Sequence, residues 1–203
     1  MKKLNQYIFK RKAKKFLQHS TREKRWVDYK SAKTILLLFE SDYIEKNRFI
    51  RRIIDELNQD GKKVVAWGFL DKKITSTAIL PTFRILDRST IDWFECPKEY
   101  CLRELAEVEF DLLIDLTLKD ILPLQYVCLY AKAGTKAGMS RSMDDIIDFK
   151  IIIPEPDPDE LTTGNDENHI EFKDLNETLF HTDQQFLYEQ ILHYIKNIQT
   201  SDK

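Results

Sequence analysis

Several features that define well-known classes of protein are missing from this chain of 203 residues. Its longest uninterrupted apolar run, residues 126–131, is too short to cross a membrane or to form the core of a signal peptide. It contains three cysteines, Cys96, Cys101 and Cys128, without a C-x-x-C pair, which argues against a disulfide framework and a zinc site. These absences predict a cytoplasmic protein with no stable membrane insertion.

Glycine and the common site motifs are also scarce. With five glycines, the chain contains neither G-x-G-x-x-G nor G-x-x-x-x-G-K-S/T, and the turn after the first predicted strand reads FESDY, whose two acids oppose a pyrophosphate. The four histidines show no H-x3-H spacing, and no G-x-S-x-G elbow occurs. We therefore expect no metal and no cofactor. The sequence favours a non-catalytic role, although an enzymatic role stays an alternative.

Charge, in contrast, is abundant and unevenly distributed. The net charge is −2, but residues 1–34 contain 12 Lys/Arg against two acids, a net charge of +10. Residues 154–203 contain 12 Asp/Glu against three lysines, a net charge of −9. Such asymmetry predicts a charged partner or mutual attraction of the two ends.

Short apolar runs predict the fold. Runs such as TILLLF at 34–39 are continuous rather than alternating, as in strands buried on both faces. Helical spacing follows, with Ile50, Ile53, Ile54 and Leu57 at i, i+3, i+4 and i+7. The predicted strands are 34–39, 63–70, 110–117, 135–139 and 149–153, with 84–86 as either a strand or a loop.

Residues 110–138 form the central β-α-β step. The helix after the 110–117 strand has Pro123 in its first turn, and Gly134 is predicted to end it. Parallel strands joined by helices indicate an α/β fold: a three-layer, mainly parallel sheet (Rossmann/flavodoxin-like) with helices on both faces, a basic N-terminal helix and a C-terminal helix.

Composition divides the chain into four parts. Residues 1–32 form a basic helical arm, 33–153 the α/β core, 154–181 an acidic linker, and 182–203 a C-terminal helix that packs on the core. The capping-box pattern T-x-x-Q at Thr182 is predicted to start that last helix.

The arm is predicted to contain a helix over 3–18. Its apolar residues fall in two nearly opposite groups, Leu4, Tyr7 and Ile8 in one and Phe9, Ala13, Phe16 and Leu17 in the other. This pattern indicates a helix docked on the core through its second group, with a solvated basic face, rather than a membrane-surface helix.

Basic residues of the arm alternate with aromatic ones, as in surfaces that bind phosphate backbones and bases. We predict contact with an anionic partner, including nucleic acid, through residues 1–30. The alternative is that the arm docks on the acidic linker, in the same chain or in another copy. The candidate residues are Lys10, Arg11, Lys12, Lys14, Lys15, Arg22, Lys24 and Arg25.

Polar residues at the predicted strand ends form a second candidate site, because ligands of open α/β sheets bind there. They are Glu40, Ser41, Asp42, Asp115 and Thr117. The site fits a phosphate or nucleotide-sugar ligand, or a magnesium-dependent acidic site assisted by Thr117 or Lys136. The structural alternative makes Asp42 a helix cap and Asp115 a hydrogen-bonding residue at a strand end. A further segment, 89–97, is interpreted as a packed turn that contains Trp93 and Phe94.

Several motifs together resemble an uncharacterised bacterial family of short α/β proteins, a domain of unknown function. They are IDWF before Pro97, FDLLIDL at 110–116, PLQY at 123–126, AKA through KAG at 131–138, and DFKIII at 148–153. The resemblance covers roughly residues 30–198 and implies the α/β fold without an activity. More locally, FDLLIDLT together with AKAGTKAGM is similar to a segment in the N-terminal domain of heptosyltransferase-type glycosyltransferases. Those enzymes also need a second domain that binds the nucleotide sugar, and this chain has no room for it, so their activity is not transferred.

The leading hypothesis is therefore a non-catalytic binding or assembly module with a protein partner or self-association. The first alternative is nucleic-acid or ribonucleoprotein binding through the arm. The second is a small enzyme or ligand sensor that uses the strand-end site.

Overall fold

The computed structural model describes residues 2–20, 22–41, 45–71, 83–140, 144–152 and 172–198. Their elements, in chain order, are α1 (Lys2–His19), β1 (Thr34–Glu40), α2 (Glu45–Gln59), β2 (Lys63–Phe69), β3 (Phe83–Leu86), α3 (Glu99–Ala106), β4 (Glu109–Asp115), α4 (Leu122–Tyr130), β5 (Lys132–Met139), the 3-10 turn η1 (Asp144–Ile146), β6 (Phe149–Ile151) and α5 (Phe172–Asn197).

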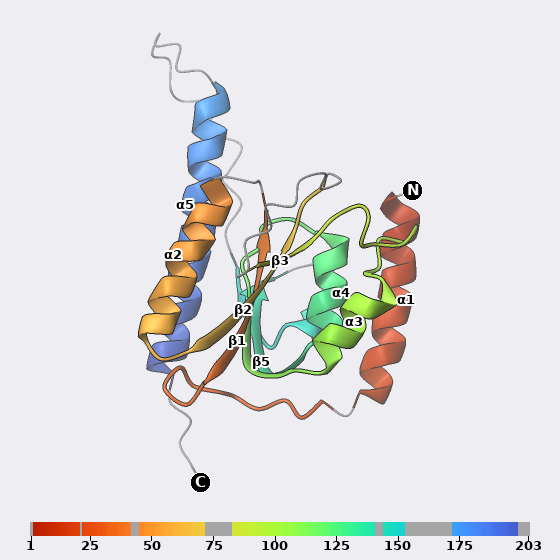
Figure 1. Cartoon of the computed structure of the whole chain (residues 1–203), viewed down its shortest axis with the longest axis horizontal. Coiled ribbons are helices and arrows are strands. Elements are labelled where there is room, and N and C mark those ends of the chain that lie inside the picture. Colours follow the sequence, from red (N-terminus) through yellow and green to blue (C-terminus); the bar gives the residue numbers. More distant parts are fainter. Residues whose placement is uncertain are drawn as a thin grey trace.

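The strands form one sheet in the order β3-β2-β1-β4-β5-β6, and every neighbouring pair is parallel. Helices α2 and α5 cover one face of the sheet, and α3 and α4 cover the other (Figure 1). The predicted three-layer α/β fold with added N- and C-terminal helices is confirmed, and residues 84–86 belong to a strand.

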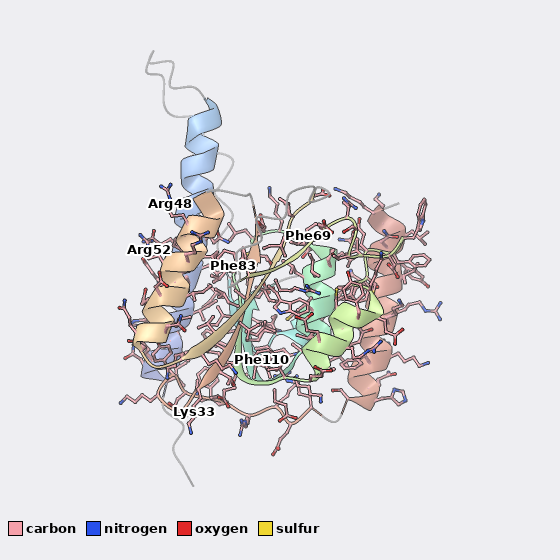
Figure 2. All side chains as sticks on the ribbon, viewed as in Figure 1. Lys33, Arg48, Arg52, Phe69, Phe83 and Phe110 are labelled. Atoms are coloured by element: carbon pink, nitrogen blue, oxygen red, sulfur yellow. The ribbon has the colours of Figure 1, made fainter. Side chains whose placement is uncertain are left out.

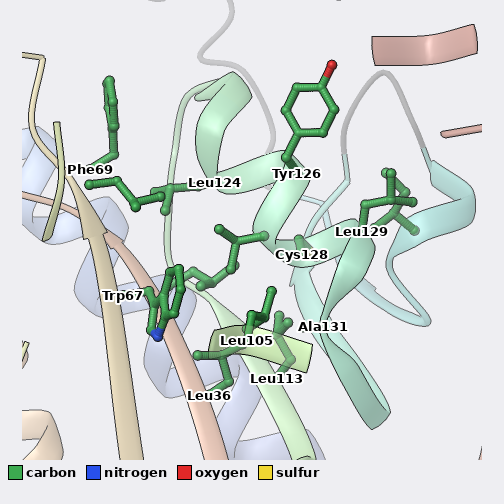
Figure 3. Packing of buried hydrophobic residues seen from close by; sticks show 14 of the residues in the cluster. Leu36, Trp67, Phe69, Leu105, Leu113, Leu124, Tyr126, Cys128, Leu129 and Ala131 are labelled. Atoms are coloured by element: carbon green, nitrogen blue, oxygen red, sulfur yellow. The ribbon is translucent and has the colours of Figure 1, made fainter. Parts of the chain in front are cut away.

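Helix α1 lies outside α4 and packs on it through the group that the sequence predicted (Figure 1). Phe9 and Ala13 are buried, whereas Leu4 and Tyr7 are exposed. The ring of Phe9 meets Tyr126 of α4 edge-on, with 4.8 Å between the ring centroids. Figure 3 shows Leu124 of α4 directed toward Phe69 while Tyr126 projects from the other side of the helix. Because it is covered on both sides, α4 is buried along almost its whole length.

A segment that we call the strap, residues 22–33, joins α1 to β1 and is bonded to the core. The backbone N–H of Val27 donates to Thr135 Oγ1 at 2.8 Å, and that hydroxyl donates to the carbonyl of Arg25 at 2.6 Å. The buried Lys62 ammonium donates to the carbonyls of Tyr29 and Ala32 at 2.5 and 2.8 Å. The strap is therefore an integral part of the domain rather than a loose connection.

The predicted role of Gly134 is wrong, because α4 ends at Tyr130 and Gly134 lies inside β5. The strap crosses this position closely. A Cβ atom on residue 134 would lie 2.8 Å from Val27 Cγ2 and 3.0 Å from the carbonyl oxygen of Asp111. Glycine is needed here for close approach of two segments, not to end a helix.

The predicted start of the C-terminal helix is also wrong. Helix α5 begins at Phe172, so the T-x-x-Q pattern at Thr182 lies within the helix. The residues before it, FKDLNETLF, contain neither proline nor glycine to stop a helix. Residues 154–171, the larger part of the predicted acidic linker at 154–181, lie outside the described residues.

Candidate functional site

The strand order brings most of the predicted strand-end site together. The order reverses between β1 and β4, and ligands of open α/β sheets bind beyond the strand ends at such a point. In the register of these strands, Leu38 lies beside Asp115, so Glu40, Ser41 and Thr117 follow at the same edge. Asp42 and its predicted cap lie outside the described residues.

The two carboxylates at this edge hold the loop after β4. Asp115 Oδ1 accepts hydrogen bonds from Thr117 N at 3.0 Å and Thr117 Oγ1 at 2.7 Å. Glu40 Oε1 accepts from the backbone N–H groups of Leu118 and Lys119 at 3.2 and 3.1 Å. Glu40, Asp115 and Thr117 are all buried. These contacts give the predicted residues a structural role, and no group of three or more metal-ligating side chains occurs in the described part of the chain.

Lys136, which the acidic-site hypothesis placed near Asp115, has a different role. Its ammonium group is buried beneath α4 and donates to the carbonyls of Cys128 and Leu129 at 2.5 and 3.2 Å. These carbonyls belong to the last turn of α4, where a cation is favoured by the helix dipole. Burial lowers the pKa of Lys136 to about 8. The lysine therefore caps a helix.

The structure divides the eight predicted cations into two sets. Three lie in the strap and form ion pairs with the core. Arg22 pairs with Asp148 and donates to the carbonyls of Ala133 and Gly134. Lys24 lies 3.5 Å from a carboxylate oxygen of Asp148, and Arg25 lies 3.3 Å from one of Asp111.

Asp111 shows how firmly this end of the strap is held. Its Oδ2 accepts from the backbone N–H groups of Lys33 and Thr34 at 2.8 and 3.0 Å. Burial alone raises the pKa of Asp111, but these hydrogen bonds outweigh burial and hold the pKa below its ordinary value. The acid is therefore fixed as an anion beside Arg25.

The other five cations lie on α1, and we call them the α1 face. They are Lys10, Arg11, Lys12, Lys14 and Lys15, and all are exposed. Helix α1 contains no Asp or Glu. Among the residues that the structure describes, no carboxylate forms an ion pair with any of the five. The α1 face is thus a cationic surface without compensating charge.

The interpretation of residues 89–97 as a packed turn is wrong for its two aromatic side chains. Trp93 is 77% exposed and Phe94 is 38% exposed, while Ile91 and Cys96 on either side are buried. Asp is a common first residue of a β-turn, so Asp92 was the one feature of the sequence that indicated exposed side chains at Trp93 and Phe94. The side-chain amide of Asn5 in α1 donates to the carbonyl of Trp93 at 3.4 Å, so this turn lies beside α1.

Fold and surface together define a three-layer α/β protein whose outermost helix carries a cationic face. A family described as a family of unknown function (DUF6913) matches residues 2–164, and the chain belongs to this family. No curated protein and no solved structure matches the chain. The predicted membership of an uncharacterised α/β family is confirmed, while the local similarity to heptosyltransferase-type enzymes stays a prediction. Within the described ranges, no helix has both the length and the apolar character needed to span a membrane.

Proposed function

We propose that this protein is a non-catalytic cytoplasmic binding module whose partner is a nucleic acid held by the α1 face. The observation that carries the proposal is a helix with exposed cations along its outer side and no acid in its sequence. Phosphate backbones bind such surfaces because each neutralised phosphate releases condensed counterions.

The charges of α1 do not serve the stability of the helix. Lys10 and Lys14 are four residues apart, as are Arg11 and Lys15, and like charges at this spacing repel. Lys2 and Lys3 stand in the first turn, where the helix dipole disfavours cations. Each effect costs about 0.2–1 kcal/mol. A polyanion on the α1 face would relieve this repulsion.

The geometry of α1 suits a linear ligand. The helix rises about 1.5 Å per residue, so the α1 face extends about 8 Å along the helix from Lys10 to Lys15, and the exposed Lys3 lies about 10 Å before Lys10. Phe9 and Ala13, on the opposite side of the helix, are buried in the core, so the α1 face is held against the domain. The strap cations are left out of the proposed surface because they already form ion pairs with the core. Arg22 and Lys24 share Asp148, and Arg25 pairs with Asp111, so the three cations keep one uncompensated charge at most.

The enzyme alternative receives less support from the strand-end site. Glu40 and Asp115 both accept hydrogen bonds from the loop that follows β4. These hydrogen bonds account for the two carboxylates without a ligand or a reaction.

The test uses fluorescence anisotropy with a labelled 20-nucleotide single strand and the full chain. The variant replaces Arg11, Lys14 and Lys15 by glutamine. Its control replaces three exposed arginines of α2, Arg48, Arg51 and Arg52, and so removes the same charge from the other side of the sheet (Figure 2). With five phosphate contacts, log K falls with log salt at a slope of about −3.5, and with two at about −1.4. Circular dichroism checks that both variants fold.

Selective loss of affinity and of salt dependence in the α1 variant supports the proposal. Equal losses in the α2 control show that net charge rather than the α1 face controls binding, which overturns it. Failure of the wild-type chain to bind any nucleic acid also overturns it, as does binding restricted to anionic vesicles.

A further inference from the structure

The turn with the two exposed aromatics is a short hairpin. Ile91 and Pro97 pair as an antiparallel bridge, and Asp92 N donates to the carbonyl of Cys96 at 2.8 Å. Glu95 N donates to the carbonyl of Asp92 at 3.1 Å, which closes a four-residue turn. Trp93 and Phe94 are the two central residues of this turn and therefore form its tip. We call residues 91–97 the aromatic finger.

The finger is ordered before any ligand arrives. Asp92 Oδ1 accepts from the backbone N–H groups of Phe94 and Cys96 at 2.8 and 2.9 Å. Glu95 has a φ of 61°, the left-handed conformation that follows the turn in many tight hairpins. A preordered binding element loses little conformational entropy on binding, so its contacts contribute fully to affinity.

The fold does not explain the residues at the tip. Turn tips usually contain Gly, Asn, Asp, Ser or Pro, which adopt turn conformations readily. Here a tryptophan with 77% of its surface exposed occupies the tip, and no aromatic neighbour among the described residues packs on it. Flat exposed aromatic rings beside cations are the surfaces on which unpaired bases stack.

The finger and the α1 face are neighbours. The loop between β3 and α3 reaches the N-terminal half of α1 (Figure 1), and Asn5 donates to the carbonyl of Trp93. From Asn5, the cations at residues 10–15 begin about 8 Å and end about 15 Å farther along the helix. If one base of a nucleic-acid strand stacks on Trp93, the phosphates that follow this base can therefore lie along α1, beside its cations.

We propose that the aromatic finger stacks on an unpaired base, which makes the ligand class single-stranded nucleic acid rather than duplex. This inference rests on the proposed function of α1. A base within a duplex is already stacked on both sides and offers no free face, whereas every unpaired base does. The α1 face supplies affinity through charge, and Trp93 supplies the preference for single strands.

The experiment compares a 12-nucleotide single strand with a blunt 12-base-pair duplex, using the full chain and its variants Trp93→Ala and Trp93→Phe. Loss of one stacked base weakens single-strand binding about 5- to 150-fold. Trp93→Ala shows this loss while its duplex affinity is unchanged, and Trp93→Phe retains most of the affinity because a phenyl ring still stacks. The control is Phe186→Ala, which removes an exposed aromatic of α5. Because Trp93 is exposed, its replacement leaves the melting temperature unchanged.

The outcomes separate the two proposals. If Trp93→Ala binds single strands as tightly as the wild type while the α1 variant does not, the finger has no stacking role and the α1 proposal stands. Equal weakening of single-strand and duplex binding by Trp93→Ala also refutes the stacking role. Insertion of Trp93 into anionic vesicles, seen as a blue shift of its fluorescence without nucleic-acid binding, overturns both.

Discussion

Replacing Lys136 by methionine tests how a buried ammonium group affects the pH dependence of stability. In the native protein its Nζ bonds to the carbonyls of Cys128 and Leu129, and the residue is 2% exposed. Methionine has a similar length and carries no proton to titrate. Comparison of the two proteins therefore isolates the titration of this one lysine.

The magnitude follows from the two pKa values. Burial, the largest cause, lowers the pKa of Lys136 from 10.5 to about 8. Between these values the unfolded chain binds a proton that the native protein does not, so stability rises with pH, by about 1.4 kcal/mol per pH unit. From pH 7 to pH 10 the free energy of unfolding of the wild type should therefore gain about 2.5 kcal/mol over that of Lys136→Met. This contribution is lost as the pH falls through 8.

Urea unfolding followed by circular dichroism at pH 7, 8, 9 and 10 measures the difference. Burial also raises the pKa of Tyr29, Tyr126 and Tyr188, but these tyrosines are present in both proteins and their effects cancel. The matched control is Lys63→Met, which removes an exposed lysine of β2 and should leave the difference flat. A flat or falling difference for Lys136→Met would refute the reasoning.

Three further substitutions test the strap, the finger and the α1–α4 contact by urea unfolding at neutral pH. Gly134→Ala places a Cβ atom 2.8 Å from Val27 Cγ2 and should lower the free energy of unfolding by about 1–3 kcal/mol. An unchanged free energy of unfolding would show that the strap can shift away from position 134 without cost. Glu95→Asn suits a φ of 61° better and should stabilise by about 1 kcal/mol, whereas destabilisation would contradict strain at this position. Tyr126→Phe removes a buried hydroxyl that has no hydrogen-bond partner among the described residues, and it should raise the free energy of unfolding by about 1 kcal/mol. A loss of stability would mean that the hydroxyl makes a hydrogen bond.

Much of the fold could be predicted from the sequence because it depends on local patterns. A run such as TILLLF reads as a strand buried on both faces, and it forms β1, at the centre of the sheet. The spacing of apolar residues on α1 predicted which side would dock, and Phe9 and Ala13 are buried as expected. Residues a few positions apart determine both patterns, so no knowledge of distant contacts was needed.

The candidate sites depended on distant contacts, which only the tertiary structure decided. The cations of α1 and of the strap look alike in sequence, yet Arg22 pairs with Asp148 across 126 positions and Arg25 with Asp111 across 86. The path of the strap along β4 and β5 sets these pairs, and the same path requires glycine at position 134. The sequence by itself determined which segments are strands and helices. The packing of the strap on the sheet decided which of these cations form ion pairs within the described part of the chain, because ion pairs form between groups that the fold brings within a few ångströms.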